Sequence, residues 1–146
     1  STAGSASATA AASPAKGGTI TFGRAAATTS FDLNNQITAN NAFAIDKVFE
    51  PLVSFDTEGS IVPWLAERYE VAQDGRTWTF HLRRGVRFHD GNEVNAAAVR
   101  FSFERLLMLG KGPAGIFKRM GLTPEMIRAV DSHTVEIQLA QPYGPF

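Results

Sequence analysis

The chain contains no cysteine, so disulfide bonds, thiolate metal sites and thiol catalysis are excluded for its 146 residues. It also has no excess of charge of either sign, because 14 Lys and Arg residues balance 14 Asp and Glu residues. No global field therefore steers the chain toward nucleic acid or an anionic membrane. No apolar run reaches the length of a membrane span, and the first residues lack the basic and apolar regions of a signal peptide.

The composition is that of a globular domain, with 44% hydrophobic and 19% charged residues. Residues 1–17 are small, low in complexity and carry a single charge at Lys16. We expect them to form a flexible leader, left after removal of a signal peptide, before a folded body at residues 18–146. The same composition also fits an ordinary disordered terminus or an artefact of expression. The aromatic and proline-rich residues 141–146 normally lead into a further element, so we expect the body to be incomplete at its C-terminus.

Alternating apolar and polar residues predict short strands, which turn residues join in pairs. The predicted strands cover residues 19–22, 52–55, 68–71, 77–83, 127–130 and 134–139. Within residues 77–83, Trp78, Phe80 and Leu82 share one face, which we expect to lie in the core.

Capping residues and apolar spacing predict helices. The first begins at Asn40 or Asn41 and continues to about Phe49, and a longer helix follows Asn95 and ends at Gly110. The apolar stripe of the longer helix comprises Val99, Phe103 and Leu106, widened by Phe101. A short helical turn is expected at residues 116–120.

The one cluster of histidine and carboxylate in the sequence comprises His81, His89 and Asp90. A hydrolase or a metal centre needs three or four converging groups. His81 falls on the polar face of a predicted strand, and His89 falls in a turn that Asp90 itself can cap. We therefore expect no catalytic residue, no metal and no cofactor. An enzyme built around these three residues is the competing hypothesis, and it requires a turnover that is lost when His89 is replaced.

A small basic run, Arg83-Arg84 with Arg87, stands beside Phe88. Because the chain has no net charge and no matching motif, we expect no nucleic-acid partner. The glycines of residues 110–112 lack the spacing of a phosphate-binding loop.

Several short motifs follow one another at regular intervals. They are Phe49–Leu52 (FEPL), Pro63–Glu67 (PWLAE), Asp74-Gly75, Thr79–Arg83 (TFHLR), Gly85-Val86, Phe88–Gly91 (FHDG) and Pro142–Phe146 (PYGPF). In this order they resemble the extracytoplasmic solute-binding proteins that serve ABC importers for peptides, oligopeptides and nickel. The resemblance covers residues 19–146. It departs at Leu33, where the family has proline, and at Ala98, where the family has an acidic residue.

The resemblance implies an α/β fold with a mixed sheet, forming the N-terminal part of lobe I of a two-lobed, class II-like periplasmic binding protein. It implies a monomeric bacterial protein of the periplasm that is no enzyme. Such a protein captures a small solute, with a peptide as the preferred ligand, and delivers it to an ABC permease complex. The alternative is a sensor or chaperone-like interaction module that uses the same lobe for protein contacts.

The same resemblance points to two ligand-binding segments. The loop after the first strand corresponds to Ala27, Thr28 and Thr29, and the segment after the signature helix corresponds to Ile116 and Phe117. Residues 26–29 contain no carboxylate of the kind that peptide binders can use for a peptide amino group, and threonine hydroxyls suit neutral polar ligands equally well. Both threonines also fit ordinary loop positions.

Overall fold

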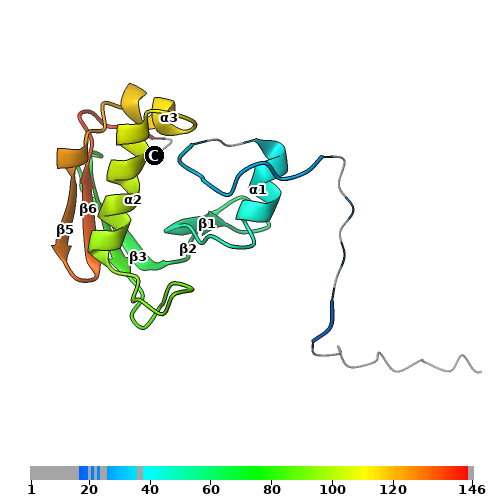
Figure 1. The fold of residues 1–146 in the computed structure, drawn as a ribbon. Helices are drawn as coiled ribbons and strands as arrows, with labels where there is room; N and C mark the ends of the chain where they lie inside the picture. Colours follow the sequence, from blue (N-terminus) through cyan, green and yellow to red (C-terminus); the bar gives the residue numbers. More distant parts are fainter. Residues whose placement is uncertain (1–16, 20, 22, 24–25, 36–37, 145–146) are drawn as a thin grey trace, which may run out of the picture.

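The computed structural model describes residues 17–19, 21, 23, 26–35 and 38–144. In chain order the elements are α1 (Ala39–Ile45), β1 (Val53–Phe55), β2 (Ile61–Pro63), β3 (Ala66–Val71), β4 (Thr77–Leu82), α2 (Ala96–Leu109), α3 (Ala114–Arg119), the 3₁₀ turn η1 (Pro124–Met126), β5 (Ile127–Asp131) and β6 (Thr134–Gln138). A four-stranded sheet carries α2 across one face, and α1 lies to the side with the β1–β2 hairpin (Figure 1). Within the described ranges, no helix combines the length and apolar character needed to cross a membrane.

The larger sheet has the strand order β3-β4-β6-β5, and every neighbouring pair in it is antiparallel. The β1–β2 pair is antiparallel as well. The combination of helices and sheet is confirmed, but the predicted mixed sheet is wrong for the strands that the structure describes. Short turns reverse the chain within each hairpin. The longer connection from β4 to β6 includes β5, which reverses the chain once more before β6 joins the sheet.

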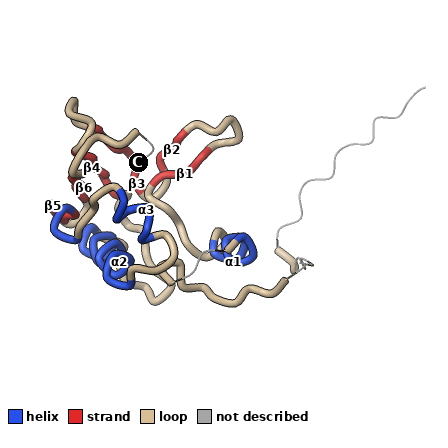
Figure 2. Tube along the Cα trace, turned by 90° about the horizontal axis from the view of Figure 1, so that it is seen from above, coloured by secondary structure: helices blue, strands red, loops and turns tan. Residues whose placement is uncertain are grey.

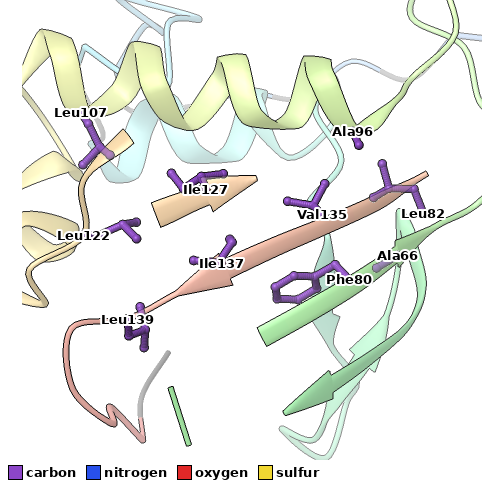
Figure 3. Close-up of a cluster of buried hydrophobic side chains, with 10 residues drawn as sticks. All are labelled: Ala66, Phe80, Leu82, Ala96, Leu107, Leu122, Ile127, Val135, Ile137 and Leu139. Atoms are coloured by element: carbon purple, nitrogen blue, oxygen red, sulfur yellow. The ribbon is translucent and has the colours of Figure 1, made fainter. Parts of the chain in front are cut away.

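The core lies between this sheet and α2, as Figure 3 shows. Phe80 and Leu82 are buried and Trp78 is half-buried against the same cluster, as the alternation along β4 predicts. The β6 residues Val135 and Ile137 have no exposed surface. Burying one such side chain contributes about 1.5–3 kcal/mol, so these two residues stabilise the packing of the sheet against α2.

The long helix α2 begins and ends where its capping residues predict. The Asn95 Oδ1 atom accepts a hydrogen bond from the backbone N of Ala98 at 2.9 Å, and Gly110 ends the helix with φ 63°. Its buried residues are Ala96, Leu106 and Leu107. Phe101 is 63% exposed, so its predicted place in the apolar stripe is wrong. It lies on roughly the opposite side of the helix from Phe103, which packs against the core.

The short helix α1 begins earlier and ends sooner than predicted. Its N-cap is Thr38, whose Oγ1 accepts from the backbone N of Asn41 at 3.2 Å, so the predicted cap at Asn40 or Asn41 is wrong. Thr38 has the extended backbone that a cap requires, and it precedes the other candidate caps, Asn40 and Asn41, along the chain. The helix ends at Ile45 and tightens into turns of the 3₁₀ type, in which Lys47 N donates to the carbonyl of Ala44 at 3.2 Å and Val48 N donates to that of Ile45 at 2.9 Å.

The β1–β2 hairpin turns at Asp56, whose Oδ1 accepts from the backbone N atoms of Glu58 and Ser60 at 2.9 and 2.8 Å. This turn follows the strand predicted at residues 52–55. Sequence reasoning missed β2, which has only three residues and includes Pro63. In Figure 2 the hairpin and α1 both lie on the side of the molecule away from β5.

The strand predicted at residues 19–22 is not formed at Thr19 or Thr21, while Ile20 and Phe22 lie outside the described residues. Residues 1–16 of the predicted leader, and residues 145–146 of the predicted exit, lie outside them too. Among the described residues, the larger sheet consists of strands from residue 66 onward.

Candidate functional site

The loop at residues 26–35 carries three of the five predicted ligand contacts, and Asn41 holds it against α1. Thr29 donates to the Oδ1 atom of Asn41 from its backbone N at 3.0 Å and from its Oγ1 at 3.4 Å. The acceptor must be the amide oxygen, because a backbone N–H can only donate. Asn41 is fully buried, and its Nδ2 makes no hydrogen bond in the described part of the chain. Ala27 is exposed and Thr28 is half-buried, so this end of the loop is open to solvent.

The other end of the loop is tied to α2 by a two-pronged ion pair. Arg105 Nη1 donates to Asp32 Oδ1 at 2.8 Å, and Arg105 Nη2 donates to Asp32 Oδ2 at 2.6 Å. Asp32 Oδ1 also accepts from the backbone N of Asn34 at 3.1 Å, and Asn34 Nδ2 donates to the carbonyl of Ser102 at 3.4 Å. Hydrogen bonding from Arg105 lowers the pKa of Asp32 to about 2, so this carboxylate is ionised at neutral pH.

The second predicted segment lies on α3, where its two residues face different surroundings. Ile116 is 50% exposed, whereas Phe117 is half-buried and packs against the core cluster. The rings of Phe117 and Phe103 meet edge to face with their centroids 5.8 Å apart. Phe117 therefore supports the position of α3, and Ile116 presents an apolar side chain to solvent.

The loop at residues 26–35 contacts α2 at Ser102 and Arg105, through Asn34 and Asp32, and α3 contacts α2 nearby at Phe103. Two grooves border this helix. One of about 630 Å³ is lined by Asn34 and Arg105, among others, and one of about 350 Å³ is lined in part by Lys118. Neither of these two grooves is lined by any of the five predicted residues.

The cluster of His81, His89 and Asp90 does not converge. His81 Nε2 lies 3.4 Å from Glu70 Oε1 on the polar face of β4, and His89 is exposed. Asp90 accepts from the backbone N and from the Nδ2 of Asn92, both at 2.9 Å, which lowers the pKa of Asp90 and caps its turn as expected. Among the described residues, no group of three or more His, Asp and Glu side chains is arranged to hold a metal ion.

A different Ser-His-Glu chain of hydrogen bonds does form. Ser132 Oγ lies 2.8 Å from His133 Nδ1, and His133 Nε2 lies 3.3 Å from Glu93 Oε1. In the same turn, the carbonyl of Ser132 accepts from the backbone N of Ala96 at 2.9 Å, and the carbonyl of His133 accepts from the N of Leu82 at 2.7 Å. The β5–β6 turn is thereby fastened to the start of α2 and the end of β4.

Residues 60–146 match the family model described as "Bacterial extracellular solute-binding proteins, family 5 Middle". The chain belongs to this family. The match spans β3 to β6 and therefore includes α2, the helix that anchors the loop. Its members are binding proteins, which confirms both the resemblance and the expectation that the chain is no enzyme.

This solute-binding protein is similar to two curated proteins of Escherichia coli K12. It is 35% identical over 132 residues to the probable D,D-dipeptide-binding periplasmic protein DdpA, and this match covers 87% of the chain and 25% of DdpA. It is 41% identical over 102 residues to the dipeptide-binding protein, and this match covers 59% of the chain and 19% of that protein. The chain thus spans about a quarter or less of the length of these relatives.

Among solved structures, the solute-binding protein resembles the Escherichia coli murein tripeptide binding protein MppA. The TM-score is 0.74 at 29% sequence identity, and the alignment covers 81% of this chain and 26% of that chain. The α/β arrangement around α2 is therefore one that a solved binding protein also adopts over part of its length.

Sequence reasoning did not identify Asn41 and Arg105 as the residues that fix the loop. The sequence presents Asn41 only as a candidate helix cap, and it indicates no role for Arg105. The turn at Asp32 is closed locally by the hydrogen bond from the backbone N of Asn34. No signal in a single sequence shows that Asp32 pairs with a base 73 residues away.

Proposed function

We propose that the chain is part of the substrate-binding component of an ABC importer. It captures a small solute, preferably a peptide, in the bacterial periplasm and delivers it to a membrane permease complex. Family membership through residues 60–146 is the observation that carries this proposal. The choice of a peptide is supported by the names of the relatives, which are binding proteins for dipeptides and for a murein tripeptide.

In this proposal the described unit is the N-terminal part of lobe I, and a second lobe closes over the ligand and replaces the water around it. Ala27, Thr28 and Thr29 supply a backbone edge and two hydroxyls, and Ile116 supplies an apolar contact. Phe117 does not contact the ligand directly in this proposal; it supports the position of Ile116, because its ring packs against Phe103.

The charge of the loop determines which chemical groups of a peptide the loop can bind. Asp32 is the carboxylate of the loop at residues 26–35, and both of its oxygens are engaged by Arg105. A carboxylate that is neutralised in this way does not hold a peptide ammonium group. We therefore place both hydroxyls against neutral polar atoms of the ligand. The Thr28 hydroxyl can meet a peptide carbonyl or amide group, whereas the Thr29 hydroxyl, whose proton goes to Asn41, accepts from a peptide N–H.

The test uses the full-length protein from its natural source. Molecules released on denaturation are identified by mass spectrometry, and the emptied protein is titrated calorimetrically with Ala-Ala, Ala-Ala-Ala and nickel ions. A released peptide, with binding of at least one of the two alanine peptides, is the expected result. Binding of nickel alone would contradict the choice of a peptide and leave solute capture standing. Binding of a reduced, unfolded protein but of no small solute would support the interaction-module alternative.

The loop contacts are tested by Thr28→Val and Thr29→Val, with Thr57→Val in the exposed β1–β2 turn as the matched control. Loss of one hydroxyl hydrogen bond weakens binding by about two- to tenfold. The control is expected to bind as the wild type does. Equal affinities for all four proteins would remove both threonines from the site.

A further inference from the structure

Two side chains from different helices hold the loop at residues 26–35. At one end Thr29 donates twice to the buried Asn41 of α1. At the other end Asp32 accepts both prongs of Arg105 from α2. Within the described residues the loop has no strand partner of its own. Its conformation therefore depends on these side-chain contacts more than on backbone pairing.

We propose that Asp32 and Arg105 are positioning residues for ligand binding, holding the loop so that Thr28 and Thr29 meet the solute in a fixed geometry. This inference rests on the proposed function, because it assigns a role in binding to residues that do not themselves touch the ligand. It adds a determinant of affinity that lies outside the five predicted contacts.

The geometry of the pair suits this role. A planar guanidinium that meets both oxygens of a carboxylate fixes the orientation of its partner as well as its distance, which a single charge contact does not. Arg105 also stands on a rigid support, because its neighbours Leu106 and Leu107 are buried in the core. The core therefore sets the position of Arg105, and Arg105 sets the position of Asp32.

The restraint passes from Asp32 to Thr29 through a short piece of chain. The backbone N of Asp32 donates to Ser30 Oγ at 3.0 Å, which closes a local turn between the two anchors. Thr29 itself is fixed by Asn41. With both anchors held, Ser30 and Phe31 between them have little freedom, and Thr28 adjoins the anchored Thr29. Release of Asp32 leaves this segment held at Thr29 only.

The variants are chosen so that each changes one contact. Asp32→Asn keeps an oxygen for the backbone N of Asn34 but removes the charge that Arg105 meets. Arg105→Gln removes the guanidinium, and Arg105→Lys keeps the positive charge without the two-pronged geometry. The matched control is Arg100→Gln, which breaks the Arg100–Glu104 ion pair on the same helix, a contact with no partner in the loop.

The first readout is amide hydrogen exchange of residues 26–35 in the full-length protein. Asp32→Asn and Arg105→Gln are expected to speed exchange in the loop by about threefold or more, with β4 and β6 amides unchanged. The double variant should exchange no faster than either single variant, because one contact is lost in all three. Arg105→Lys should be intermediate and Arg100→Gln should match the wild type. Unchanged loop exchange in both single variants would overturn the proposal.

The second readout is the dissociation constant for Ala-Ala and Ala-Ala-Ala, measured by calorimetry on the same proteins. Affinity is expected to fall by about threefold or more in Asp32→Asn and Arg105→Gln, and to recover partly in Arg105→Lys. A wild type that binds these peptides, with variants that bind equally well, overturns the positioning role and leaves the proposed function intact. A wild type that binds neither peptide contradicts peptide capture directly and withdraws the positioning role with it.

Discussion

The rings of Phe103 and Phe117 meet edge to face, with centroids 5.8 Å apart and planes at 87°. The contact joins α2 to α3 and is the favoured geometry for two aromatic rings. The two residues of the α3 segment therefore differ in their surroundings: Phe117 packs inward, whereas its neighbour Ile116 is half exposed.

Phe117→Ala is therefore expected to lower the free energy of unfolding by about 2–3 kcal/mol, less than for a fully buried ring because Phe117 is only half-buried. Ile116→Ala is the matched control and should change the free energy by less than about 0.5 kcal/mol. Urea denaturation of the full-length protein measures both. Equal effects in the two variants would contradict the inward packing of Phe117.

Asn95→Ala removes the side-chain acceptor at the start of α2 and leaves the backbone N of Ala98 without its partner. The expected loss is about 1 kcal/mol of unfolding free energy. Asn95→Asp keeps an acceptor oxygen and places a negative charge at the helix N-terminus, so it should be about as stable as the wild type. If Asn95→Asp proved as unstable as Asn95→Ala, the capping role would be wrong.

The ion pair of Asp32 makes the stability of the protein depend on pH, with the contribution lost in acid. Its pKa is lowered from 3.8 to about 2 in the folded protein by hydrogen bonding from Arg105, so its contribution is complete above about pH 4 and is lost as the pH falls through about 2. Asp32→Asn and Arg105→Gln should each make the melting temperature fall less steeply between pH 4 and pH 2. Thermal melts across this range measure the slope. Part of the slope should remain in both variants, because the pKa values of Asp90 and Asp131 are lowered as well.

Two glycines near the end of α2 should respond to alanine in opposite directions. Gly110 has φ 63°, and an added Cβ atom would lie 2.9 Å from the flexible end of Lys118, so Gly110→Ala is expected to cost about 1 kcal/mol. Gly115 lies inside α3 with open space around it, so Gly115→Ala is expected to stabilise by about 0.5–1 kcal/mol. Thermal or urea unfolding distinguishes the two. A stabilised Gly110→Ala variant would show that the left-handed cap is not required.

Local signals predicted the parts of the fold that local physics determines. The alternation through Trp78, Phe80 and Leu82 identified β4 and its buried face, and Asn95 and Gly110 identified both ends of α2. These signals suffice because a strand with one dry face and a capped helix each leave their pattern within a few residues.

The remaining errors arose where several local choices were equivalent. Thr38, Asn40 and Asn41 can all cap a helix, and Asn41 instead serves the loop through Thr29. Phe101 is as apolar as its neighbours, but the direction in which α2 faces the sheet leaves it in solvent. The candidate site depended on the family resemblance, and the residues that fix its loop depend on contacts between distant segments.

The pairing of β4 with β6 has a consequence for how the chain folds. The β3–β4 and β5–β6 hairpins each close a short loop, so each forms with a small entropic cost and early in folding. Pairing Thr77 with Gln138 instead brings together residues from distant parts of the sequence. We expect the meeting of the two hairpins beneath α2 to be the slow step of folding, because contacts between distant segments must be found by diffusion of the chain. Until that step is complete, the facing edges of β4 and β6 are both unpaired, and this is the interval in which the newly exported chain is most exposed to aggregation.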